Sequence, residues 1–339
     1  MIKVAVIGAG ILGEVHAQAV SEGVHEELVA VCDLNPVRAE TIAKQYQIHA
    51  YTDYHEMLKQ EEIDAVIVAT PDFAHAEPVI ACLQSEKHVL MEKPLATTLP
   101  DAKRIREEKN KHPGLCCMVN YTNRWSPPFA KAKEMIQSGK MGAPVMMSTK
   151  LNDTLWVSTE MMSWASKTSC MSFLGSHDVD LFLWMFECGI SEVYATGVKK
   201  VLISRGIDSY DAIQASVKFE NGCIGTVENS WIVPNTYPIT ADGKKQIYLE
   251  RGFINMDTGV DQIIAYDEAQ GSIPTFNVLY TENGKVAGAF KLAHDHFIDC
   301  ILEQREPEPN VESAYRVAEI IEAMHRSIKS GKPVTLPLS

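Results

Sequence analysis

The chain of 339 residues is longer than the roughly 250 to 300 residues at which a single hydrophobic core usually stops growing, so two domains are expected. Its content of 46% hydrophobic and 22% charged residues is that of an ordinary globular protein and excludes a disordered or fibrous chain. The formal charge of -13, from 31 basic and 44 acidic residues, is spread along the sequence and disfavours nucleic acid and anionic membranes as partners.

Two further features of the composition bear on location. No apolar run is long enough to span a bilayer, and the first residues lead into a glycine-rich turn without a signal-peptide pattern, so a cytoplasmic location is expected. The eight cysteines include no C-x-x-C pair and mostly lie among apolar residues. This pattern favours buried free thiols over disulfides or a metal cluster.

The first predicted elements are a strand, a glycine turn and a helix. A β-branched apolar run, 2–7, leads into G-A-G-I-L-G at 8–13, which opens a helical stretch. This is the G-x-G-x-x-G pattern in the strand–turn–helix setting that its mechanism requires. Gly8 permits the tight turn, Gly10 lets the backbone approach a pyrophosphate, and Gly13 lets the helix pack close to the strand. Dinucleotide binding at the start of this helix is therefore predicted.

The second apolar strand predicts which dinucleotide binds. It ends in Asp33, twenty residues after Gly13, where a carboxylate can accept both ribose hydroxyls of the adenosine and would repel a 2'-phosphate. Arg38 weakens this preference, because it could reach a phosphate, but Leu34 and its successor supply no basic residue directly after Asp33. NAD is therefore favoured over NADP.

Helices and strands then alternate along the chain. The predicted elements are a helix near 36–46, a strand at 49–52, a helix near 53–60, an apolar strand at 64–70, a helix at 74–86 and a strand at 88–93. This alternation predicts parallel βα units. Thr70 and Lys93 fall at carboxyl ends of strands, the edge at which such sheets bind ligands.

Lys93 lies in V-L-M-E-K-P-L-A, 89–96, between an acidic residue and a proline at the end of an apolar strand. A lysine is costly to bury unless its charge or its proton is used. Pro94 lacks an amide hydrogen and is expected to end the strand there. A surface lysine that caps a strand end is the alternative, but Lys93 shares its edge with Gly8 and Asp33, which favours a ligand role.

The second half of the sequence consists mainly of strand-like runs separated by turns. These runs are 191–203, 212–220, 223–233, 246–250, 252–257 and 262–267. A sheet of this kind has an open face that needs a cover, either helices or another subunit. The aromatic candidates for that face are Tyr194, Trp231, Tyr237, Tyr248 and Phe253.

Residue types that can bind metals occur at two places, and neither supplies a complete ligand set. His294-Asp295-His296 precedes the helical segment 297–304, so a solvated helix start is the favoured interpretation. His177 and Asp180 alone are too few. No metal site is predicted.

Seven segments together resemble one enzyme family nearly from end to end. They are residues 8–13, Asp33, A-T-P-D-F-A-H (69–75), M-E-K-P-L-A (91–96), 120–142, L-G-S-H-D-V-D-L-F-L-W-M (174–185) and 312–337. The chain thereby resembles the Gfo/Idh/MocA oxidoreductases, which include glucose-fructose oxidoreductase and inositol 2-dehydrogenase. The resemblance implies an α/β Rossmann domain at 1–122 and an α+β domain with a large, mostly antiparallel sheet at 123–339. Its last helix, near 311–330, can pack back on the first domain, and the sheet often forms the interface of a homo-oligomer, a dimer or tetramer.

The resemblance also implies a reaction. The family oxidises or reduces a secondary hydroxyl of a sugar, sugar acid or cyclitol by hydride transfer with a nicotinamide. Lys93 would hydrogen-bond the reacting hydroxyl, and His177 would donate or accept the proton. Asp180, three residues later on the same helix face, would be its relay partner. A histidine simply tied to a neighbouring carboxylate is the alternative.

The resemblance carries over a set of binding residues. Those expected at the cofactor are Gly8, Gly10, Ile11, Leu12, Gly13, Asp33, Leu34, Arg38, Thr70, Pro71, His75, Glu92 and Lys93. Those expected at the substrate are Tyr121, Arg124, Trp125, Lys150, Asn152, Trp164, Phe173 and His177. Arg124 could hold a substrate carboxylate or clamp the domains, and the tryptophans could stack on a sugar ring or belong to the core.

One position departs from the family pattern. Dehydrogenases of the inositol type carry an aspartate four residues before the histidine, where this chain has Phe173. Phe173 could stack on an apolar sugar face or an aglycone, or lie in the core. The departure keeps open a glycoside-cleaving enzyme that oxidises its sugar transiently. A non-catalytic dinucleotide sensor is a further alternative, disfavoured because Lys93 is present.

Overall fold

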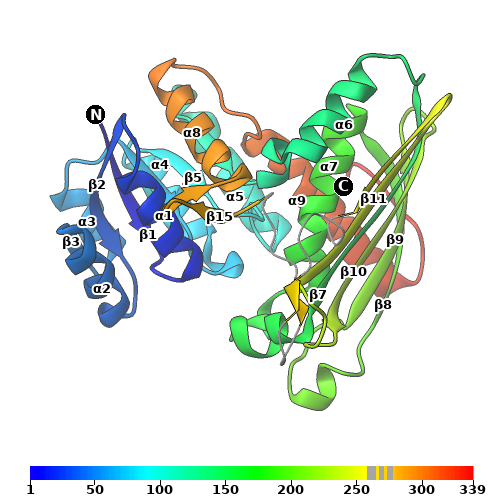
Figure 1. Cartoon of the computed structure of the whole chain (residues 1–339), viewed down its shortest axis with the longest axis horizontal. Coiled ribbons are helices and arrows are strands. Elements are labelled where there is room, and N and C mark those ends of the chain that lie inside the picture. Colours follow the sequence, from blue (N-terminus) through cyan, green and yellow to red (C-terminus); the bar gives the residue numbers. More distant parts are fainter. Residues whose placement is uncertain (258–264, 267–270, 273–277, 339) are drawn as a thin grey trace. The chain divides into compact units, whose positions relative to one another are not determined.

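The computed structural model describes residues 1–257, 265–266, 271–272 and 278–338. The chain forms two compact units (Figure 1). Unit 1 comprises Met1–Thr122 and Val278–Tyr315, and unit 2 comprises Asn123–Asn277 and Arg316–Ser339. Each unit is built on a large sheet of its own.

Unit 1 has a six-stranded parallel sheet in the order β3-β2-β1-β4-β5-β6. Its strands are β1 (Ile2–Ile7), β2 (Glu26–Cys32), β3 (His49–Tyr51), β4 (Ala65–Val68), β5 (His88–Met91) and β6 (Cys117–Val119). The helices between them are α1 (Ile11–Ser21), α2 (Pro36–Tyr46), α3 (Tyr54–Gln60), α4 (Ala76–Gln84) and α5 (Leu99–Lys111). This strand order is that of a doubly wound dinucleotide-binding sheet, which confirms the predicted Rossmann fold.

A later part of the chain also belongs to unit 1. The hairpin of β15 (Tyr280–Glu282) and β16 (Lys285–Ala287) is followed by α8 (Ala289–Leu302). Phe290 of α8 and Val286 of β16 form one apolar cluster with Ala19 of α1. The sequence analysis assigned all residues after 122 to the second domain. Burial of these apolar side chains against α1 instead groups 278–315 with the first unit.

Unit 2 has a seven-stranded sheet in the order β12-β11-β7-β10-β9-β8-β17. Its strands are β7 (Pro144–Thr154), β8 (Ile190–Val198), β9 (Ala212–Phe219), β10 (Ile224–Val233), β11 (Ala241–Leu249), β12 (Gly252–Asp257) and β17 (Val334–Thr335). The β7–β10 pair is parallel and the other pairs are antiparallel. The mostly antiparallel sheet predicted for the second domain is confirmed.

Unit 2 also contains three α-helices and a short ribbon among its described residues. They are α6 (Pro127–Gln137), α7 (Ser176–Phe186), most of α9 (Val311–Ser330) and a two-stranded ribbon of β13 (Ala265–Tyr266) and β14 (Gly271–Ser272). Of the predicted run 262–267, only residues 265–266 are described, and they form β13. The sequence analysis did not predict β7, because its residues P-V-M-M-S-T-K-L-N-D-T mix polar and apolar types on both faces.

The large sheet of unit 2 has an inner face covered by helices and an outer face that is open. Strand side chains alternate between the two faces: on β10, Val227, Asn229 and Trp231 are buried, whereas Ile224 is 52% exposed. Of the predicted aromatic face, Trp231 is therefore on the inner side. Tyr194, Tyr237, Tyr248 and Phe253 are partly exposed.

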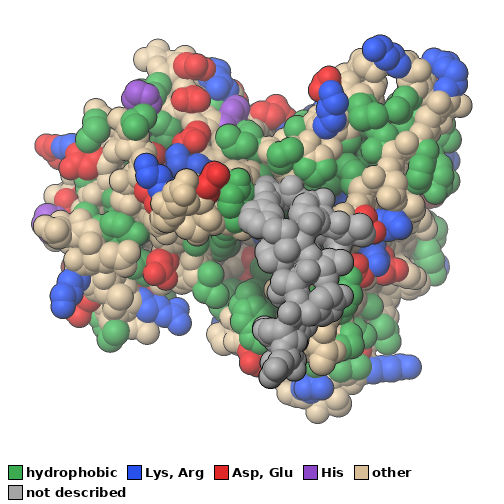
Figure 2. All heavy atoms as spheres, viewed as in Figure 1, with side chains coloured by type: hydrophobic (Ala, Val, Ile, Leu, Met, Phe, Trp, Pro, Cys, Tyr) green, Lys and Arg blue, Asp and Glu red, His purple; other side chains and the backbone are tan. Residues whose placement is uncertain are grey.

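The surface carries both signs of charge. On the face shown in Figure 2, acidic and basic side chains are interspersed. This mixture is consistent with the even spread of charge along the sequence. None of the helices formed by described residues is both long and apolar enough to cross a membrane.

Candidate active site

The turn between β1 and α1 requires glycine for two different reasons. Gly8 has a φ of +99°, and a Cβ atom there would lie 2.5 Å from the carbonyl oxygen of Ala69. A Cβ atom on Gly13 would lie 1.8 Å from the carbonyl oxygen of Gly8, so α1 can approach β1 only without one. At Gly10 a Cβ atom would meet nothing within 4 Å. The backbone is therefore open at Gly10, as binding of a pyrophosphate at a helix N-terminus requires.

Asp33 lies directly after β2 and is held by two backbone amides. Its Oδ2 accepts a hydrogen bond from the amide of Ala9 at 2.7 Å, and its Oδ1 accepts one from Asn35 at 2.7 Å. The first bond ties the carboxylate to the glycine turn. Leu34 and Arg38, which the sequence analysis also assigned to the cofactor, are exposed beside it. The carboxylate and the turn thus fit the adenosine half of NAD.

Lys93 is half-buried two residues after β5, at the carboxyl edge of the sheet. The turn it occupies is held by His75, which is 1% exposed. Nδ1 of His75 lies 2.8 Å from the carbonyl oxygen of Pro94, and its Nε2 lies 3.0 Å from that of Thr70. His75 therefore joins the ends of β4 and β5. These contacts give His75 a role in fixing the backbone of this edge, and its contact with the cofactor stays a prediction.

Glu92 belongs to a buried polar network in unit 1. Its Oε1 lies 2.9 Å from Nε2 of His16 on α1 and accepts a hydrogen bond of 2.8 Å from Nδ2 of Asn120. Burial lowers the pKa of His16 despite its carboxylate partner. Burial opposes ionisation of Glu92, but the hydrogen bonds from His16 and Asn120 and the charge of Lys93 outweigh it and lower its pKa. The contact between His16 and Glu92 connects the glycine-turn helix to the residue next to Lys93.

In unit 2, His177 lies on a continuous helical segment. A π-helical turn at Met171–Gly175 precedes α7, which begins at Ser176. In the run 170–182, Phe173 and His177 are half-exposed and every other residue is buried. They are four residues apart and so lie on the same face. The predicted candidates Phe173 and His177 are therefore presented together.

Asp180 forms a buried ion pair with Arg124, which the sequence analysis did not predict. Its Oδ2 accepts from Nε of Arg124 at 3.0 Å and its Oδ1 from Nη2 of Arg124 at 2.7 Å. Both side chains are buried, at 6% and 1% exposure. A two-point guanidinium–carboxylate pair of this kind fixes geometry. It ties α7 to the turn that carries Arg124, within unit 2; whether Arg124 also holds a substrate carboxylate or clamps the domains stays a prediction.

Asp178, the residue after His177, forms a second buried ion pair. Its Oδ1 lies 3.0 Å from Nζ of Lys245, and its Oδ2 accepts a hydrogen bond of 2.9 Å from Nδ2 of Asn229. Nζ of Lys245 also donates to the carbonyl oxygen of Lys150 at 2.9 Å. The sequence analysis missed Lys245 and Asn229. The available signal was period 2 in β11, where Lys245 falls on the same face as Ile247.

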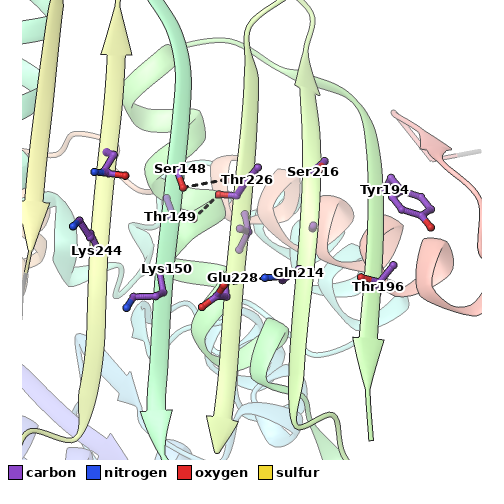
Figure 3. A pocket seen from close by; sticks show the side chains of 13 residues that line it. Ser148, Thr149, Lys150, Tyr194, Thr196, Gln214, Ser216, Thr226, Glu228 and Lys244 are labelled. Atoms are coloured by element: carbon purple, nitrogen blue, oxygen red, sulfur yellow. Dashed lines mark hydrogen bonds between the residues drawn. The ribbon is translucent and has the colours of Figure 1, made fainter. Parts of the chain in front are cut away.

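Lys150 and Asn152, predicted at the substrate, project from the outer face of the sheet. Nζ of Lys150 donates to Asp242 at 2.5 Å, and Nδ2 of Asn152 donates to Glu228 at 2.9 Å. Figure 3 shows Lys150 and Glu228 in a polar hollow of this face, with helices behind the sheet. His177 belongs to a helix on the opposite face. Strand alternation sends Lys150 and Asn152 away from it.

The other predicted residues occupy varied places. Tyr121 is buried at the end of the unit 1 sheet, and Trp125 and Trp164 are half-buried in unit 2. His294, expected at a solvated helix start, is 1% exposed within α8, and its Nε2 lies 2.8 Å from Oε2 of Glu26. That expectation is wrong, because α8 begins at Ala289 and turns His294 toward the core.

The cysteines and metal-ligand types can be assessed for the described residues. All eight cysteines are free thiols, and all but the half-buried Cys188 are buried. Burial raises the pKa of Cys32 and of Cys117 to about 12, so these thiols are unreactive at neutral pH. The described part of the chain contains no group of three His, Cys, Asp or Glu side chains arranged to hold a metal ion.

Two family models match the chain. The NAD-binding Rossmann fold of an oxidoreductase family matches residues 2–121, and the C-terminal alpha/beta domain of the same family matches residues 133–336. A scyllo-inositol 2-dehydrogenase (NAD(+)) of Bacillus subtilis is 29% identical over 346 residues, which cover 99% of this chain and 96% of that protein. An inositol 2-dehydrogenase of Rubrobacter xylanophilus is 26% identical over 337 residues, covering 98% of this chain and 92% of its own.

Solved structures share the fold over the whole chain. A myo-inositol 2-dehydrogenase from Lactobacillus plantarum superimposes with a TM-score of 0.87 at 20% identity, with 99% of both chains covered. A scyllo-inositol dehydrogenase from Lactobacillus casei with bound NAD(H) and scyllo-inositol gives a TM-score of 0.84 at 18% identity, again with 99% of both chains covered.

Proposed function

Because the chain belongs to the Gfo/Idh/MocA oxidoreductase family, we propose that it is an NAD-dependent dehydrogenase of a secondary hydroxyl in a cyclitol or a related sugar. The observation that carries this proposal is the ligand edge of unit 1, where the open Gly10 backbone and Asp33 fit NAD and a half-buried Lys93 lies at the same edge. The names of the full-length relatives support a cyclitol as substrate.

We assign the following roles in the reaction. Gly8, Gly10 and Asp33 hold the dinucleotide, whose nicotinamide exchanges a hydride with the carbinol carbon when it is bound. Lys93 donates a hydrogen bond to the reacting oxygen and favours its alkoxide character. His177 takes the hydroxyl proton during oxidation and returns it during reduction. Asp180 and Arg124 hold the helix that carries His177, which gives Asp180 a positioning role.

The first experiment screens a panel of substrates and monitors NADH formation by its absorbance. Purified protein with NAD is offered inositol isomers, sugars and sugar acids, and we expect NADH to form with at least one cyclitol or sugar. Failure with every member would contradict the dehydrogenase. Release of nitrophenol from nitrophenyl glycosides without net NADH would instead identify the glycoside-cleaving alternative.

Asp33 should determine the preference for NAD. We expect Asp33→Ser to raise the KM for NAD by about 10- to 100-fold, since a hydrogen bond to a charged group contributes roughly 1.5–3 kcal/mol. The variant should also accept NADP better, because the repulsive charge is gone. The ratio of kcat/KM for the two cofactors measures this. Adding Arg38→Ala to the variant tests whether Arg38 then binds the 2'-phosphate of NADP. If Asp33→Ser left the ratio of kcat/KM for NAD and NADP unchanged, Asp33 would not determine the cofactor preference.

We also propose that the chain forms a homo-oligomer through the outer face of the unit 2 sheet. Large apolar side chains from four strands are partly exposed on that face: Tyr194, Ile224, Tyr248 and Phe253. Among them, Tyr248 and Phe253 are cross-strand neighbours with ring centroids 4.8 Å apart. An exposed apolar area of this kind is typical of an interface.

Light scattering coupled to size-exclusion chromatography tests the oligomer. The wild type should have the mass of a dimer or tetramer, and Ile224→Glu with Tyr248→Glu should reduce it, because each places a charge in an apolar interface. Val24→Glu, at a residue of unit 1 that is 79% exposed, is the control and should leave the mass unchanged. An unaltered mass in the double variant would place the interface elsewhere.

A cytoplasmic location is proposed as well, on the basis of the eight free thiols, which are typical of a reducing compartment.

A further inference from the structure

The helical segment that presents His177 also presents an aromatic ring. Phe173 and His177 are the half-exposed members of the run 170–182, so a ligand that reaches His177 on this segment meets Phe173 as well. No other side chain of the run is accessible to it. The chemistry of this face is therefore set by one imidazole and one phenyl ring.

Both carboxylates of the run 170–182 are buried in ion pairs. Asp178 is paired with Lys245 and Asn229, and Asp180 is paired with Arg124. Their exposed fractions are 0% and 1%. Neither side chain is therefore exposed on the surface that Phe173 and His177 share. Within this run, the position one helical turn before His177 therefore offers apolar surface and no carboxylate.

The ring of Phe173 is supported from behind. Its centroid lies 6.0 Å from that of Trp231 on β10, with an interplanar angle of 57°, and Trp231 is completely buried. The segment also rests directly on β10, because a Cβ atom on Gly175 would lie 2.6 Å from Oδ1 of Asn229. The turn before it is fixed by Ser169, whose Oγ lies 2.9 Å from Nε2 of His325. Phe173 consequently stands on a segment that is held in place, next to a completely buried tryptophan ring.

We propose that Phe173 determines substrate specificity by selecting a cyclic polyol in which a methylene or O-alkyl group replaces a free hydroxyl beside the reacting carbinol. The substrate class is thus a deoxy or O-methyl derivative of a cyclitol or sugar. This inference rests on the proposed dehydrogenase function. Its physical basis is desolvation, since a free hydroxyl placed against the ring loses its water and the phenyl group itself offers no strong hydrogen-bond acceptor in return, whereas a methyl or methylene group gains apolar contact.

The test compares matched substrates by steady-state NADH formation. Each of scyllo-, myo- and D-chiro-inositol is assayed beside its mono-O-methyl ethers and monodeoxy analogues. We expect the wild type to favour one derivative over its parent by about tenfold in kcat/KM, the scale on which an apolar pocket discriminates by one small group. Phe173→Asp should reverse that order by supplying an acceptor, and Phe173→Leu, which stays apolar, should preserve it.

Two further measurements keep the test decisive. Phe173→Asn supplies a neutral acceptor in case the buried charge of the aspartate variant prevents folding. Calorimetric titration of the same compounds into the protein with NADH reports binding in a complex that cannot turn over, and it should give the same order of affinities.

The outcomes separate the inference from the function on which it rests. If the wild type has a higher kcat/KM for each parent inositol than for its derivatives, the proposed role of Phe173 is overturned. The dehydrogenase function would still stand. The same conclusion follows if the order is unchanged in both polar variants. Neither turnover nor binding with any of the compounds would overturn the cyclitol dehydrogenase, and this inference with it.

Discussion

Replacement of Lys93 by methionine should lower kcat/KM by about 10²- to 10⁴-fold, the range in which a positioned proton or hydrogen-bond partner contributes to a reaction. Methionine has a similar length and fills a half-buried site without strain, so the loss would report the ammonium group. Binding of NAD should change little, because Gly10 and Asp33 hold the other half of the cofactor. Steady-state kinetics and calorimetric titration with NAD measure the two quantities.

A matched pair of variants identifies what Lys93 supplies. Lys93→Arg keeps the positive charge, but its planar head group has a different shape and cannot place a donor at the same point, so it should remain nearly as impaired as Lys93→Met. If Lys93→Met retained turnover within tenfold of the wild type, Lys93 would be a lysine that caps a strand end. If Lys93→Arg were fully active, its charge alone would suffice.

The residues next to Lys93 are held in place by several contacts, which is a further reason to expect a large loss of activity when Lys93 is replaced. Glu92 is fixed by His16 and Asn120, and the backbone after Lys93 is fixed through His75. These contacts come from three parts of the unit 1 chain and converge on one short turn. A residue that must act at a defined place is expected to have such support.

The unit 1 fold could be predicted from the sequence because its signals are local. The glycine pattern, the apolar run 2–7 and the acidic end of the second strand all lie within about one βα unit. The strands of a parallel sheet are also continuous apolar runs, which makes them easy to find. Segment 278–315 could not be placed this way, because its membership in unit 1 depends on contacts of Phe290 with α1, far away in the sequence.

The candidate site could be predicted only in part, and for a similar reason. Lys93, Asp33 and His177 follow from local patterns or from family resemblance. Lys245 and Asn229 lie on strands far from Asp178 in sequence, and only the folded sheet brings them to it. The position of Lys150 on the outer face could not be predicted, because the strand β7 was not predicted and its alternation was not available.

The largest effect on stability is expected at the buried pair of Asp178 and Lys245. Their side chains are 0% and 2% exposed, so removal of one partner leaves the other charge buried without compensation. We expect Lys245→Met to lower the free energy of unfolding of unit 2 by about 3–5 kcal/mol, the usual cost of breaking a buried ion pair. The carbonyl oxygen of Lys150 would lose its donor at the same time.

The tryptophans allow this loss to be measured in unit 2 alone. All five, at 125, 156, 164, 184 and 231, belong to that unit, so their fluorescence during denaturant unfolding reports its transition separately from unit 1. Asp178→Asn in the Lys245→Met background removes the uncompensated charge while its amide can still bond to Asn229. The double variant should therefore be more stable than Lys245→Met alone, because the penalty arises mainly from the isolated charge. If the two substitutions simply added, the pair would not be coupled, and α7 would be held on the sheet by its apolar contacts and by Arg124 instead.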